Sequence, residues 1–422
     1  MRRISVERRL LLKAAAGAVF GLINGASLAD ILQAGSGPDG KGPGGDDLAS
    51  AQSRLGENLI RYLADHAKPG ANLIVSPASL ASILAFVDLG ANSLMRSAIH
   101  RTLGFKPAAR LRTEQDLAAL RNGVAAISAR SAGPLTLANL LAFDLSTRPL
   151  QLALLGLSGA GADVLVDNLG DAKMIGRINE WVRQKTRDLI PSIIEEAPED
   201  MGLVAINALY FKDRWKTPFD PARTQSAPFQ AASGRPVDAR MMYSPVAKFN
   251  FRQDERFIAA ELSYANDDFK LVIVTTKSAH APLSEFSPVA GWLSGRGFEL
   301  KGGEVGLPKM SLSASEELLR PLDALGLRSA RLMPDALEGF SAMSLAITRV
   351  VQKLDLRLSE EGTEAAAATA VVTTRSLGPH DHVGMIVDKP FMFALRDQKT
   401  GLILFTGYVG TPAESDKTSF RQ

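Results

Sequence analysis

The segment that most constrains the fold lies near the carboxyl end, where a strand-like stretch runs into a run of small residues. Across residues 350–358, inward-type and outward-type side chains alternate, which is typical of a half-buried β-strand with Gln352 facing inward. Residues 363–374 follow, and period two gives them one uncharged face and a second face whose sole charge is Glu364. Residues 378–382 have the composition of an exposed loop. The stretch therefore suits an exposed loop and a central strand alike.

Helix propensity gives a competing interpretation of the same stretch. Thr363 followed shortly by four alanines has the pattern of a capped helix start. The β-branched residues in 369–374 disfavour such a helix within two turns, because their side chains lose rotamer freedom there. The pattern favours the strand.

Composition and charge exclude several functions. The chain of 422 residues has no Cys, which excludes disulfides, thiolate nucleophiles and iron–sulfur sites, and its five His show no metal-ligand spacing. The formal charge is +3, but residues 1–29 carry a net +4, which leaves −1 for the rest. A near-neutral body lacks the basic surface that nucleic acid requires. We expect no metal, no cofactor and no nucleic-acid partner.

The first 29 residues have the pattern of an export signal. Arg8 and Arg9 precede a short apolar run rich in Ala and Gly, and Ser27-Leu28-Ala29 offers small residues for cleavage. The paired arginines resemble a twin-arginine signal, whereas Glu7 stands where that motif usually has Ser or Thr, so ordinary secretion stays open. We expect a secreted or periplasmic protein that has no membrane segment once mature. Residues 30–50 are predicted to be a flexible Gly/Pro-rich leader.

The rest of the chain predicts a single large α+β domain over residues 51–412 with a tail at 413–422. Helices and strands mix irregularly and no long repeat is visible. The predicted helices and strands are helices from 51, at 77–90, at 173–190 and near 315–325, and strands at 72–75, 203–211, 258–263, 270–276 and 304–313.

Five motifs, in order, resemble the serpin family of serine protease inhibitors. The similar segments are the entrance to the central helix at 72–79, the strand and Trp turn at 207–215, the LPKF-like strand at 307–310, the hinge at 361–367 and the carboxyl-terminal signature at 385–395. The resemblance implies the serpin fold, with a main mixed sheet, further sheets, about nine helices and an exposed reactive-centre loop. It identifies the chain as a member of that family, and the signal suggests a bacterial exported one.

The resemblance also implies site residues and a mechanism. They are the hinge Glu361, Gly362, Thr363, Glu364, Ala365, Ala366, Ala367 and Ala368, the polar shutter Ser76, Ser79, Asn207 and Gln352 under the sheet, and Trp215 at the breach where the loop enters. Many members have His where this chain has Gln352. A protease that attacks the loop becomes acylated, and the loop then inserts as a strand into the main sheet. Serpin loop insertion is a known instance of stored strain. The implied partner is a serine protease held in a covalent acyl complex by a monomeric inhibitor, which is not an enzyme.

Two peptide bonds compete as the reactive bond. Arg375–Ser376 suits the anionic pocket of trypsin-like proteases, whereas counting in family register from Gly362 gives Ser376–Leu377. We favour Arg375–Ser376. The alternative function is a serpin-fold binding protein that does not inhibit, although such members usually carry bulky, charged or proline residues in the hinge. A secreted hydrolase lacks a nucleophile elbow and a plausible triad.

Overall fold

The computed structural model describes residues 45–107, 110–130, 134–196, 202–278, 282–363 and 382–413. Its α-helices are α3 (Gly45–His66), α4 (Pro77–Val87), α5 (Ser93–Thr102), α6 (Arg110–Arg130), α7 (Gln151–Ala160), α8 (Ala172–Lys185), α9 (Leu319–Leu322) and α10 (Arg328–Arg331). Among these helices none combines the length and apolar character that crossing a membrane requires.

The strands form two sheets. The larger sheet contains, in spatial order, β1 (Leu73–Val75), β17 (Ile403–Val409), β16 (Phe391–Asp397), β10 (Phe269–Thr276), β9 (Phe257–Ser263), β8 (Ala247–Gln253), β11 (Glu299–Pro308), β7 (Pro236–Tyr243) and β6 (Gln225–Gln230), with β15 (His382–Ile386) paired to β11. The smaller sheet contains β3 (Asp163–Asp167), β2 (Leu135–Asp144), β4 (Leu203–Phe211), β13 (Ile347–Leu358), β14 (Gly362–Thr363) and β5 (Asp213–Arg214), with β12 (Met310–Glu317) paired to β13.

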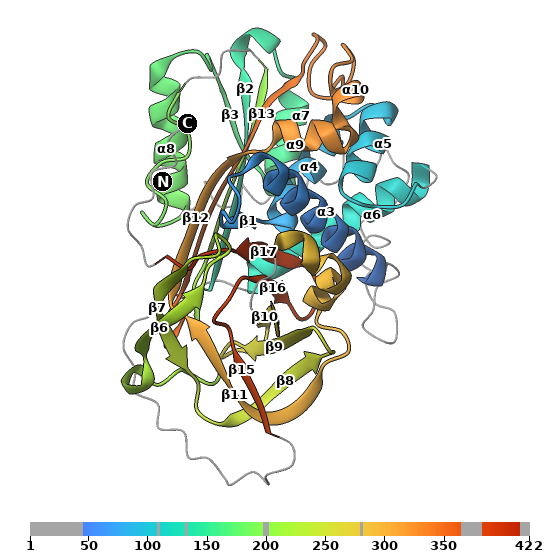
Figure 1. The fold of residues 1–422 in the computed structure, drawn as a ribbon. Helices are drawn as coiled ribbons and strands as arrows, with labels where there is room; N and C mark the ends of the chain where they lie inside the picture. Colours follow the sequence, from blue (N-terminus) through green and yellow to red (C-terminus); the bar gives the residue numbers. More distant parts are fainter. Residues whose placement is uncertain are drawn as a thin grey trace, which may run out of the picture.

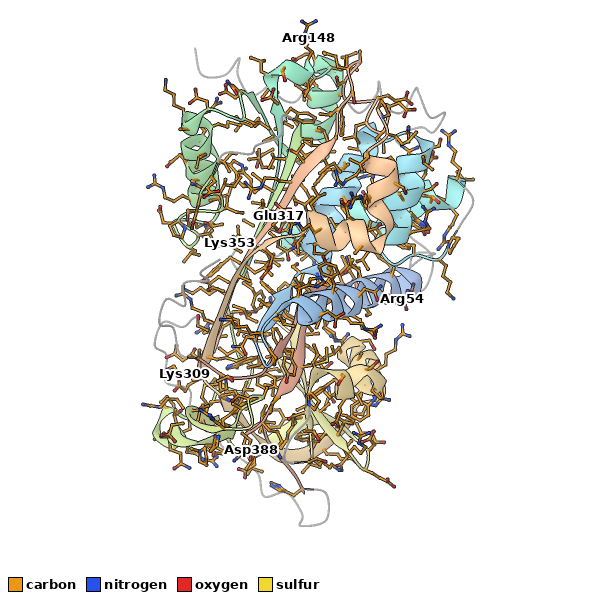
Figure 2. All side chains as sticks on the ribbon, turned by 45° about the horizontal axis from the view of Figure 1, so that its top comes forward. Arg54, Arg148, Lys309, Glu317, Lys353 and Asp388 are labelled. Atoms are coloured by element: carbon orange, nitrogen blue, oxygen red, sulfur yellow. The ribbon has the colours of Figure 1, made fainter. Side chains whose placement is uncertain are left out.

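The smaller sheet is mixed, and its centre is a parallel ladder. β4 and β13 pair in parallel from Leu203 opposite Ile347 to Tyr210 opposite Asp355, and we call this ladder the seam. On the other side of β13, β12 pairs antiparallel, and β2 pairs antiparallel with β4. The sheet runs along the molecule between the end marked by Arg148 and the end where Lys309 and Asp388 lie (Figure 2).

Both faces of the seam are covered by helices. All nine residues of β4 are buried, because α4 packs on one face of the sheet and α8 on the other (Figure 1). Met174, Ile178 and Val182 of α8 belong to one apolar cluster that includes residues of β4 and Val351 of β13. α4 is itself buried throughout and belongs to the main core. Any strand entering the seam would therefore lie between two helical layers.

Three sequence expectations are corrected by the structure. The strand expected at 304–313 is two strands in different sheets, because the chain passes from one sheet to the other at Lys309. The helix expected near 315–325 begins at Leu319, because β12 continues to Glu317. The helix expected at 173–190 ends at Lys185, followed by Arg187 and Asp188 with positive φ.

The predicted leader also ends earlier than expected, because residues 45–50 are already helical in α3. The predicted signal at 1–29 lies outside the described residues, as does the tail beyond Ala413.

Candidate functional site: the sheet seam, its shutter and the hinge

The predicted shutter residues lie under the seam in two hydrogen-bonded groups. In the first group, Gln352 of β13 bridges to the start of α4: its Oε1 accepts from the backbone N–H of Ser76 (2.9 Å). Its Nε2 donates to the Ser76 carbonyl (3.1 Å) and to Oγ of Ser79 (2.7 Å). The Ser76 side chain also caps α4 by accepting from the Ser79 N–H. All three residues are almost fully buried, so the amide of Gln352 ties β13 to the helix beneath it.

Asn207 belongs to the second group rather than to the first. It lies opposite Gln352 in the seam, yet its Nδ2 donates to Oδ1 of Asn139 on β2 (2.8 Å) and to the Ala138 carbonyl (3.3 Å). Asn139 in turn donates to Ser82 of α4 (3.0 Å). The polar groups on the two sides of the seam are therefore tied to α4 separately. Within the described residues, the buried Oδ1 of Asn207 accepts no hydrogen bond.

Removing the Gln352 amide is expected to destabilise the native protein. Gln352→Ala leaves the buried Ser76 N–H without its acceptor and creates a small cavity, together costing about 3 kcal/mol of unfolding free energy. Urea unfolding of the intact protein measures this loss. Lys353→Ala, on the opposite face of the same strand, is the control and should cost less than about 1 kcal/mol. Equal losses in both variants would mean that the amide network contributes little.

The hinge begins at the end of the seam as a tight turn over residues 359–363. The Ser359 N–H and hydroxyl both donate to the Gly362 carbonyl (2.8 and 2.9 Å). Gly362 has φ +154°, and a Cβ on it would lie 2.1 Å from the Asp213 carbonyl oxygen. Glycine is therefore required where the chain passes close to β5.

Trp215 contacts this turn through both its backbone and its indole ring. Its backbone N–H donates to the Glu361 carbonyl (2.9 Å) and its indole Nε1 to the Ser359 carbonyl (2.9 Å). The indole stacks on Tyr264, with ring centroids 4.4 Å apart. The Tyr264 hydroxyl lies 2.7 Å from Oγ1 of Thr363. The described part of the hinge is thus fixed through both its backbone and its last side chain.

Three ionisable groups at the hinge have shifted pKa values. Burial alone would raise the pKa of Glu360, but hydrogen bonds, including those with Lys309 Nζ (3.0 Å) and Thr224 Oγ1 (3.0 Å), lower it overall. Burial raises the pKa of Asp213, although the N–H of Arg214 partly opposes this. Burial also raises the pKa of the Tyr264 phenol, so the hydroxyl at Thr363 is neutral at physiological pH.

The two strands that pair with β14 specify one common path into the seam. Thr363 pairs with Leu358 of β13 and with Asp213 of β5, both antiparallel. If the chain continued antiparallel to β13, residue 369 would lie opposite Gln352; if it continued antiparallel along β5 and β4, the same residue would lie opposite Asn207. Gln352 and Asn207 are already partners across the seam, so the two registers agree.

Several predicted site residues lie outside the described residues: Glu364, residues 365–368, Arg375, Ser376 and Leu377.

Three residues of the site were not predicted from the sequence: Asn139, Tyr264 and Glu360. Asn139 had a signal, since it interrupts an apolar strand as Asn207 does. Tyr264 had none, because it follows a strand of the other sheet and meets Thr363 only in the folded chain.

The candidate site thus consists of a parallel seam in a mixed sheet, a glycine hinge at one end of it and a buried helix hydrogen-bonded beneath it. The sequence model of the family "Serpin (serine protease inhibitor)" matches residues 50–412, and the chain belongs to this family. It is 30% identical to the leukocyte elastase inhibitor of Bos taurus, covering 87% of this chain and all of the relative. It is 27% identical to human glia-derived nexin, covering 82% of this chain and 89% of that protein.

Solved structures show the same fold. Serpin48 of the insect Tenebrio molitor has a TM-score of 0.75 at 24% identity, covering 87% of this chain and 99% of that one. Human thyroxine-binding globulin, solved in complex with thyroxine, has a TM-score of 0.75 at 22% identity, covering 87% of this chain and 99% of that one. The predicted α+β serpin fold is confirmed. The named relatives are animal proteins, so the expectation of a bacterial exported member stays a prediction.

Proposed function

We propose that this chain inhibits serine proteases of trypsin-like specificity, by acylation at Arg375 and insertion of the preceding residues into the seam. The protease serine Oγ attacks the Arg375 carbonyl carbon, the Ser376 amine leaves with a proton, and an ester joins the two proteins. The observation that carries the proposal is the hinge: Thr363 already pairs with β13 and with β5, and both pairings extend into the seam in one register. Relatives named as inhibitors of elastase and plasminogen activator support it.

The chemistry of residues 364–374 fits the register. Odd-numbered residues would face the side of Gln352 and α4, and they are Ala, Thr and Val. Glu364 would lie between Arg357 of β13 and Lys212, which gives the one charge of the segment two cationic neighbours. Thr369 would lie beside the buried Oδ1 of Asn207, to which its hydroxyl can donate. Insertion would thus satisfy a buried acceptor and bury no unpaired charge.

Incubation with trypsin and denaturing electrophoresis test the proposal. We expect a covalent adduct that survives boiling in detergent, at close to one protease per inhibitor. Complete cleavage of the loop with active trypsin left over would overturn it. That result would favour a binding protein that does not inhibit, a function supported by the fold similarity to thyroxine-binding globulin.

The choice of reactive bond predicts a large effect of one side chain. If trypsin acylates Arg375, Arg375→Ala removes the cation that enters its anionic specificity pocket, a loss of about 2–5 kcal/mol. We expect the second-order rate of trypsin trapping to fall by at least about 30-fold. Assays of residual trypsin activity, stopped at successive times, measure the rate. The same assay with elastase is the control. Unchanged trapping would assign the bond to Ser376–Leu377.

A further inference from the structure

A hollow of about 560 Å³ lies between α8 and the strands β3 and β2. Its lining includes the apolar residues Leu140, Leu165 and Trp181, which belong to or pack against the apolar cluster of α8, and none of its residues belongs to the shutter or the hinge. The volume falls within the range of sites that bind small molecules. The hollow therefore has the size and the apolar surface of a ligand site.

Gly176 keeps this hollow open. It lies inside α8 and lines the hollow, and a Cβ built on it meets no atom within 4 Å. A helix is less stable with glycine than with alanine at an interior position. Neither a positive φ nor a close backbone contact requires glycine here. The absence of a side chain therefore leaves free space directly against the helix backbone.

Lys173 gives the rim its charge preference. Among the described residues its ammonium group has no partner, and it stands in the first turn of α8, where the helix dipole disfavours a cation. The other charged residues of the rim have partners: Asp163 with Lys185 and with the indole Nε1 of Trp181, Arg177 with Asp167, and Glu180 with Arg183 and Gln184. The uncompensated charge at the hollow is therefore positive.

We propose that this hollow binds a small amphipathic anion, with a flat apolar body and one carboxylate or sulfonate group. The body contacts Trp181 and Leu165 and fills the space beside Gly176, while the acid group pairs with Lys173. Aromatic side chains favour such flat partners through offset stacking. The site does not depend on protease inhibition, so binding can be tested separately.

Two matched probes test the site on the full chain: 8-anilinonaphthalene-1-sulfonate, and N-phenyl-1-naphthylamine, which lacks the sulfonate. Each is titrated by its fluorescence and by energy transfer from tryptophan. We expect saturable binding of the sulfonate at one site, tighter than that of the neutral probe. Gly176→Leu fills the hollow, so both probes should bind at least about tenfold more weakly. Gly291→Leu, at another glycine with open space around it, should change neither.

Lys173→Glu reverses the charge at the rim and suits the first turn of a helix, so it should fold normally. It is expected to weaken sulfonate binding about fivefold, as for an exposed ion pair, and to leave the neutral probe unchanged. Lys248→Glu on β8 is the control and should have no effect. Sulfonate binding that is absent in the wild type, or that Gly176→Leu or Lys173→Glu leaves unchanged, would overturn the proposal.

Discussion

Cleavage after Arg375 is expected to raise the unfolding temperature of the protein by on the order of 20 °C. Insertion exchanges one parallel ladder, between β4 and β13, for two antiparallel ladders on either side of a new strand. About a dozen new strand residues at 0.5–1.5 kcal/mol for each net hydrogen bond supply on the order of 10 kcal/mol. This is comparable to the whole stability of an ordinary domain.

Differential scanning calorimetry of intact and nicked protein at one scan rate measures the difference. The nick is made with a catalytic amount of a protease that the chain does not trap, and mass spectrometry identifies the cut. Equal unfolding temperatures would mean that the seam does not take up the loop. In that case the proposed trap would have no source of free energy.

The strand character of the carboxyl-terminal region was predictable because period two is a strong local signal. Residues 350–358 alternate, and the structure has β13 at Ile347–Leu358 with Gln352 buried. The nearly continuous apolar run at 203–211 predicted a strand buried on both faces, which is what β4 is. In both strands, the residue pattern of the strand itself therefore predicts which of its faces are buried.

Features that depend on partners far along the chain were not predictable in this way. The apolar residues of 304–313 alternate on both sides of Lys309, and although their phase shifts there, no local signal shows that the second half joins another sheet. The resemblance assigns Asn207 to one polar cluster with the serines and Gln352, whereas in the structure its Nδ2 donates to Asn139 on the neighbouring strand. The contact of Tyr264 with Thr363 joins residues of different sheets. Such contacts depend on which strands become neighbours in the folded protein, and the local sequence pattern does not specify this.

The register of the hinge makes a single substitution in the loop a sharp test of insertion. If residue 363 lies opposite Leu358, residue 367 would lie opposite Leu354 and Leu209, which are fully buried on the α4 side of the seam. Ala367→Arg would place an unpaired cation among these side chains, which costs several kcal/mol. Ala366→Arg is the matched control, because residue 366 would face the other side, opposite Asp355, where the added guanidinium has a carboxylate within reach.

We expect Ala367→Arg to convert the protein from an inhibitor into a substrate of trypsin. Once acylated, the loop either inserts or is released by hydrolysis, so a penalty on insertion shifts the ratio by at least about 100-fold. The stoichiometry of inhibition and the yield of covalent adduct measure this ratio. Nicked Ala367→Arg should also lose the thermal stabilisation, whereas Ala366→Arg should keep both the adduct and the stabilisation. Equal behaviour of the two variants would contradict the register, because only a strand within the sheet distinguishes neighbouring residues by the face on which they lie.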